Sequence, residues 1–274
     1  MRIKDIRGAS PAVMGVINIT PDSFSDGGLY NTPEAALIRA EEMVEEGVRI
    51  IDIGGESTRP GSVGIGVQEE LDRVIPVLEK ILSSIDILVS CDTSKPLVAS
   101  EALKYGAVMI NDVTGAENLE MIRVVEENNA ALCIMHMKGC PETMQKDTLY
   151  DNMFEEVRDY LYAQASLCVE LGVDRENICL DPGIGFGKSP EDNLRIMGNV
   201  GYFKGDYPLL MGVSRKSVIG KYTGVEEANK RLGGSIASAV WLALEGVDIV
   251  RAHDTKETCQ ALRIAALLKE SKNE

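Results

Sequence analysis

A short apolar run that ends in a polar cluster recurs about eight times along this chain. Strands buried on both faces of a parallel sheet have this unalternating, Val- and Ile-rich pattern, because helices cover both of their faces. Polar residues that follow neighbouring parallel strands meet at one edge, so one rim should carry the function. The runs occupy residues 13–17, 48–53, 87–90, 107–110, 130–135, 177–180, 209–213 and 248–250.

Segments with helical periodicity separate these runs. The first begins after Thr32, a favourable N-cap, with Pro33 in its first turn, and ends at Gly47. The second carries its apolar residues between Leu71 and Leu82. The later helices are expected at residues 96–105, 119–128, 152–171, 190–200, 226–245 and 255–269.

Eight strand–helix units in 274 residues predict an α/β fold, a single (β/α)8 TIM barrel that spans residues 1–274. The connections after the strands are the long ones, as at residues 18–31, 54–66 and 136–150, which predicts an active site at the carboxyl ends of the strands. The alternative is an open doubly wound sheet. No Gly-x-Gly-x-x-Gly turn follows the first strand, so the barrel is favoured.

Composition excludes several classes of partner. The net charge of −15 argues against nucleic acid. No apolar stretch reaches the roughly 20 residues that a membrane span needs. The start, Met1-Arg-Ile-Lys-Asp-Ile-Arg, has no signal-peptide core, so we expect a cytoplasmic protein. Six scattered cysteines predict neither a disulfide framework nor a structural zinc site.

Four cations fall at or just beyond strand ends in this acidic chain. Any one of them alone reads as a solvated surface residue, but four on one rim favour an anionic substrate, most simply phosphate or pyrophosphate. The four are Arg59, Arg215, Lys216 and Arg251.

Three acceptor residues, Asp92, Asn111 and Asp181, directly follow three different strands. Fixed carboxylate and amide groups at a barrel mouth can pair with a flat heterocycle that carries adjacent N–H and NH2 donors, while Lys216 meets a carbonyl or nitrogen of the same ring. The alternative for each is local capping of backbone N–H groups, which Asx residues readily perform.

The first long loop carries oxygen ligands. Asn18 at the strand end, together with pyrophosphate oxygens, suits Mg²⁺, which takes few protein ligands. Asp22 or Asp26 joins only if the loop closes; otherwise this is a polar surface loop. Of the two histidines, His136 is expected to pack at a strand end, and His253 beside Arg251 to contact a phosphate oxygen.

Several stretches resemble the dihydropteroate synthase family, in the family's order and over nearly the whole chain. They are Met14-Gly-Val-Ile-Asn-Ile-Thr-Pro-Asp-Ser-Phe-Ser-Asp-Gly-Gly, Gly54-Gly-Glu-Ser-Thr-Arg-Pro-Gly, Asp92-Thr-Ser-Lys-Pro, Asp181-Pro-Gly-Ile-Gly-Phe-Gly-Lys, Gly212-Val-Ser-Arg-Lys-Ser and Arg251-Ala-His-Asp. The resemblance implies condensation of 6-hydroxymethyl-7,8-dihydropterin diphosphate with 4-aminobenzoate, a Mg²⁺ cofactor, and a homodimer formed through late helices such as residues 226–245.

The resemblance also implies roles for particular residues. Catalysis is assigned to Lys216, Arg251 and Asp92, the 4-aminobenzoate site to Phe24, Pro60, Ser214 and Arg215, and the metal to Asn18. The pterin diphosphate site is assigned to Thr58, Arg59, Asp92, Asn111, Met135, Asp181, Phe186, Lys216, Arg251, Ala252 and His253.

Two other functions remain open from sequence. A pterin-binding methyltransferase barrel shares the carboxylates but has no need for Arg59 or the Ser-Arg-Lys motif. A non-catalytic pterin-binding paralogue is favoured by loss of the anion ligands, yet Asn18, Arg59, Arg251 and His253 are all present.

Overall fold

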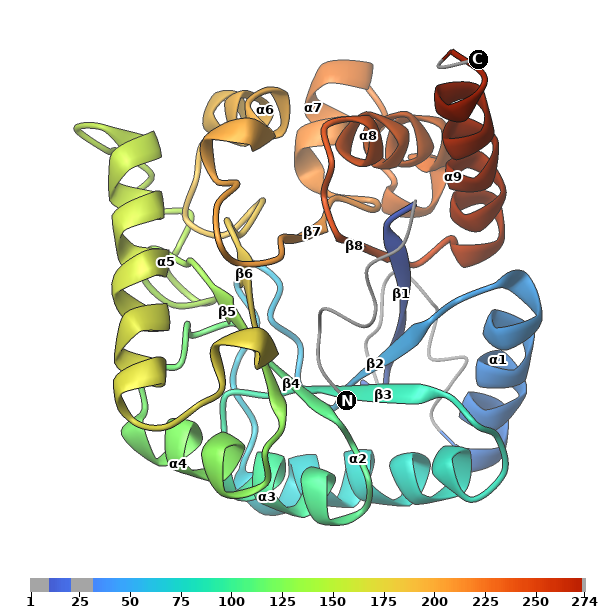
Figure 1. Ribbon diagram of the computed structural model, residues 1–274, viewed down its shortest axis with the longest axis vertical. Helices are drawn as coiled ribbons and strands as arrows, with labels where there is room; N and C mark the ends of the chain where they lie inside the picture. The colour runs from blue at the N-terminus through green and yellow to red at the C-terminus, as the bar shows by residue number, and fades with distance from the viewer. Residues whose placement is uncertain (1–9, 21–31, 273–274) are drawn as a thin grey trace.

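Strands and helices alternate around a barrel in the computed structural model, which describes residues 10–20 and 32–272 (Figure 1). The strands are β1 Ala12–Asn18, β2 Ile50–Gly54, β3 Leu88–Asp92, β4 Met109–Asp112, β5 Ala131–Met135, β6 Ile178–Asp181, β7 Leu210–Gly212 and β8 Ile249–Ala252. The α-helices are α1 Pro33–Glu46, α2 Val67–Leu82, α3 Pro96–Lys104, α4 Leu119–Glu127, α5 Met153–Glu170, α6 Pro190–Gly198, α7 Ser217–Thr223, α8 Leu232–Leu244 and α9 Thr255–Glu270. Short 3-10 helices occur at η2 Arg175–Asn177, η3 Val200–Tyr202 and η4 Ala228–Lys230.

The eight strands form one parallel sheet with the order β6-β5-β4-β3-β2-β1-β8-β7. A single bridge between Leu180 and Leu209 joins β6 to β7 and brings the two ends of this sheet together. Neighbours in the sheet are therefore neighbours in the chain all the way round. This confirms the predicted barrel and excludes the doubly wound alternative, whose strand order reverses at a switch point.

Apolar side chains fill the structure in two separate clusters. The larger cluster lies between the strands and the helices. The smaller one fills the barrel interior, where strand residues alternate inward and outward. Each fully buried Met or Ile there stabilises the fold by about 1.5–3 kcal/mol. The interior cluster consists of Ala12, Met14, Ile50, Met109, Ala131, Cys133, Cys179, Leu210 and Ile249.

Helix ends follow from local sequence. At the start of α1, the Thr32 hydroxyl accepts the N–H of Ala35 at 3.2 Å, and Gly47 ends the helix with φ 98°. Ser189 caps α6 by accepting the N–H of Asp192 at 3.0 Å, with Pro190 in the first turn. Both starts agree with the prediction.

The predicted helix over residues 226–245 is wrong at its start. Gly224, in the left-handed region with φ 73°, ends α7, and α8 begins only at Leu232. Between them the Arg231 side chain donates to the carbonyls of Val225 and Glu226, and only the short 3-10 helix η4 forms before α8. A helical pattern in sequence does not reveal such a side-chain contact.

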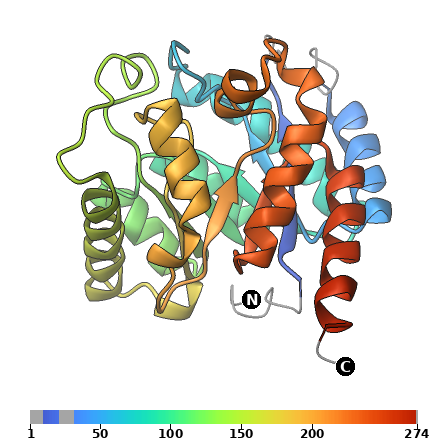
Figure 2. The same cartoon turned by 90° about the horizontal axis from the view of Figure 1, so that it is seen from above.

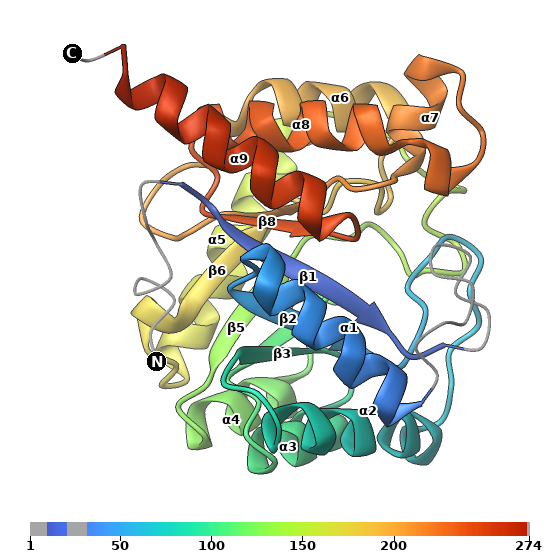
Figure 3. The same ribbon diagram turned by 90° about the vertical axis from the view of Figure 1, so that its right-hand side faces the viewer.

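The long connections project from the carboxyl ends of the strands. The loops that follow β2 and β5 extend on the side toward which β1 points (Figure 3), and they form the upper edge in Figure 2. None of the helices in the described ranges has both the length and the apolar character needed to cross a bilayer.

Candidate active site

Strand register places four strand-end residues at one level of the barrel. Asn18 of β1 pairs with Gly54 of β2, Gly54 with Asp92 of β3, and Asp92 with Asn111 of β4. Farther around the barrel, Asp181 of β6 pairs with Met135 of β5. The acceptors expected from sequence thus lie on one rim, although what they bind remains a prediction.

Arg251 is held between two carboxylates. Its Nε donates to Asp52 Oδ2 at 2.7 Å and its Nη2 to Asp92 Oδ2 at 2.8 Å. Asn111 Nδ2 also donates to Asp52 Oδ2, at 3.0 Å. Asp52 is fully buried, and such a charge is tolerated only when it is paired and hydrogen-bonded. The guanidinium plane is therefore fixed across the mouth of the barrel.

Asp92 titrates near neutral pH. Burial raises its pKa to about 7, the Arg251 guanidinium opposes this shift, and the nearby carboxylates of Asp52 and Glu70 add to it. Burial also raises the pKa of Asp181, against the opposing charge of Lys216. Carboxyl groups with raised pKa values can donate as well as accept a hydrogen bond.

Lys216 joins the ends of β6 and β7. Its ammonium donates to the carbonyl of Ile184 and lies 4.7 Å from the centre of the Phe186 ring. Burial lowers the pKa of Lys216 to about 8, while the carboxylate of Asp181 opposes that shift. This lysine is held at the rim by one hydrogen bond and one ring contact.

Ser214 and His253 contact each other across β7 and β8. The Ser214 hydroxyl lies 3.2 Å from both the backbone N and the Nδ1 of His253. Burial lowers the pKa of His253 to about 3, and the charges of Arg251, Arg215 and Arg59 contribute. His253 is thus neutral at physiological pH, so it can approach a phosphate only as a neutral N–H donor.

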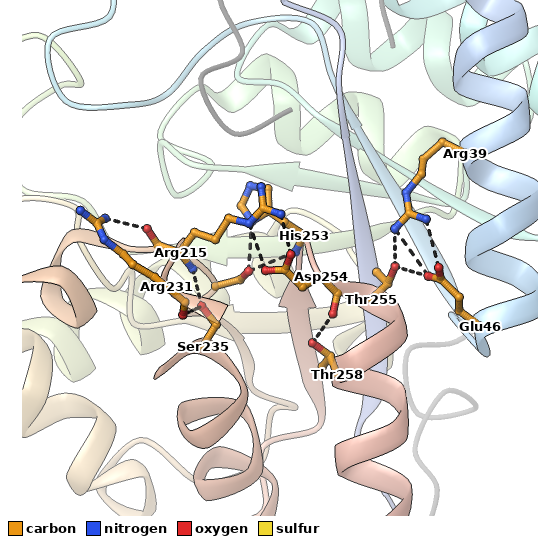
Figure 4. Close-up of polar contacts among 10 residues, drawn as sticks. Arg39, Glu46, Arg215, Arg231, Ser235, His253, Asp254, Thr255 and Thr258 are labelled. Carbon is orange, nitrogen blue, oxygen red and sulfur yellow. Dashed lines mark hydrogen bonds and ion pairs between the residues drawn. The ribbon is translucent and has the colours of Figure 1, made fainter. Parts of the chain in front are cut away.

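Arg215 has an unusual backbone conformation and a paired side chain (Figure 4). Its φ of 60° lies in the left-handed region, which non-glycine residues rarely adopt. The backbone is held because its N–H donates to Ser235 Oγ at 2.9 Å and its carbonyl accepts Arg231 Nη1 at 2.9 Å. The guanidinium binds both oxygens of Asp254, with Nε–Oδ2 at 3.0 Å. The predicted contact of Arg215 with a substrate carboxylate remains a prediction.

The loop after β2 presents Thr58, Arg59 and Pro60 and is anchored at its base. Arg73 of α2 donates to the carbonyl of Gly55 at 2.8 Å. Lys95 bridges Glu56 and Glu70, and Glu56 also accepts the N–H of Ile65 at 2.8 Å. These contacts hold both sides of the loop that carries the predicted phosphate ligands.

The loop after β5 contacts the loops that follow β2 and β6. The N–H of Gly61 donates to the carbonyl of Pro141 at 2.9 Å, and Gln145 Nε2 donates to the carbonyl of Gly185 at 2.9 Å. His136, at the foot of this loop, is buried and packs edge-on against Tyr160, as expected for a packing residue.

Asn18 is the predicted metal ligand. A Cβ on Gly54 would lie 3.4 Å from Asp92 Cβ and 3.6 Å from Asn18 Oδ1, so the amide oxygen lies near Asp92 at the end of β2. Among the described residues no group of three or more His, Cys, Asp or Glu side chains is arranged to hold a metal. One amide oxygen fits Mg²⁺ that is otherwise bound by substrate phosphates and water. Asp22, Phe24 and Asp26 lie outside the described residues.

Sequence reasoning missed Asp52, Lys188 and the Glu56–Lys95–Glu70 bridge. Asp52 left a signal, since it is a lone carboxylate within the apolar run 48–53. Lys188 closes the Asp181-Pro-Gly-Ile-Gly-Phe-Gly-Lys motif, yet nothing local indicates that its ammonium is buried.

The chain is similar to known pterin-binding proteins. The Pterin binding enzyme family matches residues 14–253. Dihydropteroate synthase of Escherichia coli (strain K12) is 45% identical over 255 residues, which are 93% of this chain and 90% of that protein.

Solved structures are equally similar. Yersinia pestis dihydropteroate synthase with a bound sulfonamide drug superposes with a TM-score of 0.93 at 39% identity, covering 96% of this chain and 95% of that one. Burkholderia cenocepacia dihydropteroate synthase complexed with 7,8-dihydropteroate has a TM-score of 0.87 at 39% identity, covering 96% and 93%. None of these relatives is a methyltransferase or a non-catalytic paralogue by name. The chain belongs to the dihydropteroate synthase family of pterin-binding transferases.

Proposed function

We propose that this protein condenses 6-hydroxymethyl-7,8-dihydropterin diphosphate with 4-aminobenzoate to give 7,8-dihydropteroate and pyrophosphate, a step of folate biosynthesis. The observation that carries the proposal is the Arg251 guanidinium held between Asp52 and Asp92 on the rim where Asn111, Asp181 and Lys216 also lie. Binding of 7,8-dihydropteroate by the Burkholderia cenocepacia relative supports the identity of the product.

The pterin ring would be recognised by its edge. Asp92, Asn111 and Asp181 supply acceptors for ring N–H and NH2 groups, and Lys216 donates to a ring carbonyl or nitrogen. Met135 and Phe186 would line the pocket, with Met135 buried at the end of β5 beside Asp181. A raised pKa at Asp92 and Asp181 lets each carboxyl share a proton with the ring.

The diphosphate would lie across β2 and β8. Arg59 and Arg251 provide positive charge, Thr58 a hydroxyl, and Ala252 its backbone. His253 is neutral and would contribute an N–H donor. Asn18 would hold Mg²⁺, which neutralises phosphate charge when bound.

The 4-aminobenzoate would lie over β7. Ser214 would donate to its carboxylate, Arg215 would supply positive charge, and Phe24 and Pro60 would form the walls. The Arg215–Asp254 pair and the Ser214–His253 contact keep these two residues oriented while the ligand is absent.

The reaction needs little acid–base chemistry from these residues. The bond from the exocyclic carbon to the diphosphate oxygen breaks, and the electron pair leaves with pyrophosphate, whose charge Arg59 and Arg251 stabilise. The dihydropterin delocalises the resulting cation. The neutral arylamine nitrogen then attacks that carbon and loses a proton. Exclusion of water by the loops protects the cation from hydrolysis.

We also propose that the chain forms a homodimer, works in the cytoplasm and folds as one domain over residues 1–274. Apolar side chains exposed on the adjacent helices α8 and α9 support the dimer, because exposed apolar surface is a common feature of interfaces. Sedimentation of the parent and of Ile264→Glu would test it: the variant should be monomeric. The exposed residues are Trp241, Leu244, Ile264, Leu267 and Leu268.

A coupled pyrophosphate assay tests the reaction. Purified protein with the pterin diphosphate and Mg²⁺ should release pyrophosphate faster when 4-aminobenzoate is added, and mass spectrometry should detect 7,8-dihydropteroate. Pyrophosphate release that does not respond to 4-aminobenzoate, with no condensed product, would refute the proposed function.

A further inference from the structure

Lys188 carries a buried ammonium group that the proposed reaction does not use. The side chain is 1% exposed, and no carboxylate lies within hydrogen-bonding distance of Nζ in the part of the chain that the structure describes. Burial of a lysine without an ionic partner is costly unless its donors are satisfied. The groups that accept from its three N–H donors therefore determine whether this burial is tolerated.

Four acceptors surround the ammonium. Nζ lies 2.9 Å from His136 Nδ1 and 3.3 Å from the His136 carbonyl. It also donates to the carbonyls of Gly183 and Phe186, each at 3.0 Å. The acceptors come from two segments, the end of β5 and the loop between β6 and α6. Lys188 thus ties these two segments together.

The two segments approach so closely that side chains are excluded between them. A Cβ on Gly183 would lie 1.9 Å from the His136 carbonyl oxygen, and one on Gly187 would lie 2.5 Å from the Lys138 carbonyl oxygen. Both glycines also have positive φ, at 71° and 64°. Converging carbonyl dipoles repel one another, and a central ammonium offsets that repulsion.

The same loop supplies contacts to the predicted pterin site. The N–H of Gly183 donates to Asp181 Oδ1 at 2.8 Å. The Ile184 carbonyl accepts from Lys216, and the Phe186 ring lies beneath that ammonium. The carbonyl groups that bind Lys188 thus alternate along the loop with groups that orient Asp181 and Lys216.

We infer that Lys188 is a positioning residue for pterin recognition: its ammonium gathers the carbonyls of the β6–α6 loop and His136, and thereby fixes Asp181, Lys216 and Phe186 in their binding arrangement. It acts through the loop and makes no contact with substrate. This inference rests on the proposed function, because it assigns the loop to the pterin.

The protonation state of His136 agrees with this geometry. Burial and the charge of Lys188 lower the pKa of His136 to about 3, so its imidazole is neutral and Nδ1 is free to accept. Burial lowers the pKa of Lys188 itself to about 7, with Asp181 opposing and Lys216 reinforcing the shift.

Lys188→Met tests the inference, since it keeps the length of the side chain and removes its donors. The matched control is Lys138→Met, which removes an ammonium of the neighbouring loop that binds Asp147 and the Leu149 carbonyl. We expect KM for the pterin diphosphate and Kd for a free pterin to rise about tenfold in Lys188→Met. The KM for 4-aminobenzoate should stay unchanged, and Lys138→Met should match the parent throughout.

A purely structural role predicts a different result. Lys188→Met would then lower the melting temperature and leave both the pterin Kd and KM at parent values, which would overturn the inference. If Lys188→Met does not fold, pterin binding by His136→Leu and His136→Asn tests the inference instead. The Leu variant removes the Nδ1 acceptor, and the Asn variant places an acceptor near the position of Nδ1. Weaker pterin binding in the Leu variant with recovery in the Asn variant supports the role, while equal binding in both contradicts it.

Failure of the proposed function would look different. A parent protein that binds pterin but makes no dihydropteroate would refute the reaction, and the Kd comparison between Lys188→Met and Lys138→Met would still measure the positioning role. A parent protein that binds no pterin would refute both.

Discussion

The amino-terminal and carboxyl-terminal halves of the barrel interior are built from the same strands. Apolar side chains line the first half, and polar and charged side chains line the second. On β2, Ile50 packs in the apolar cluster and Asp52, the next inward residue, binds Arg251. On β4, Met109 is apolar and Asn111 is polar. A step of two residues along a strand thus separates the part that stabilises the barrel from the part that meets the ligand. We therefore expect that substitutions in the apolar part change mainly stability and that substitutions in the polar part change mainly binding.

The largest test of this division is Arg251→Met. The guanidinium is proposed to stabilise the charge of the departing pyrophosphate, and loss of one such preorganised group typically costs a factor of about 10²–10³ in rate, so we expect kcat/KM to fall by about two to three orders of magnitude. Steady-state kinetics checks this, with Arg195→Met, on the half-exposed surface of α6, as the control. A loss below tenfold would show that the guanidinium is not central to the site.

The next test compares two positions on one strand. Met109→Ala should destabilise the fold by about 2–5 kcal/mol, because it opens a cavity in the barrel, and should leave KM for the pterin diphosphate unchanged. Asn111→Ala should instead raise the KM for the pterin diphosphate and change the free energy of unfolding much less. Urea unfolding and steady-state kinetics on both variants check the pair. Similar effects of the two variants on both quantities would break the division into halves.

Asp52→Asn tests the boundary between the halves. We expect kcat/KM to fall by about tenfold to hundredfold, because the amide keeps an acceptor for Asn111 but loses the charge that orients Arg251. The pKa of Asp92 should also fall, since the Asp52 carboxylate raises it. An NMR titration of the Asp92 carboxyl checks that shift, and an unmoved pKa would contradict the coupling.

The smallest effect is the pH dependence of stability. The folded pKa of Asp92, about 7, lies above its ordinary value of 3.8, so between these values the native state holds more protons than the unfolded state. Stability therefore falls as pH rises through this window. Urea midpoints at pH 4.5 and pH 7 should show a smaller fall in Asp92→Asn than in the parent. An equal fall in both would exclude Asp92 as the cause.

The sequence predicted the part of the molecule that depends on local pattern. Apolar runs predicted all eight strands, and the capping residues Thr32 and Gly47 predicted the ends of α1. The strand-end positions of Asp92, Asn111 and Asp181 followed from the same pattern, because parallel strands share one polarity.

Side-chain partners could not be predicted in this way. The Asp52–Arg251 contact joins residues 199 positions apart, and it depends on strand register and barrel closure. The pairing of Arg215 with Asp254 likewise depends on how the ends of β7 and β8 meet. In sequence Lys188 resembles a surface cation, because nothing local shows that the end of β5 and the glycine-rich β6–α6 loop enclose it.

The bridge between Leu180 and Leu209 has a mechanical consequence. It is a single bridge pair, whereas β1 and β2 share five registered pairs. The pairing between β6 and β7 is therefore the less extensive of the two. Asp181 lies at the end of β6 and Lys216 follows β7, and the hydrogen bond from Lys216 to the Ile184 carbonyl connects the two sides. A pterin bound by both residues would add a second connection between β6 and β7. Amide hydrogen exchange at β6 and β7 should then slow when pterin binds, because the ligand would stabilise the closure of the barrel.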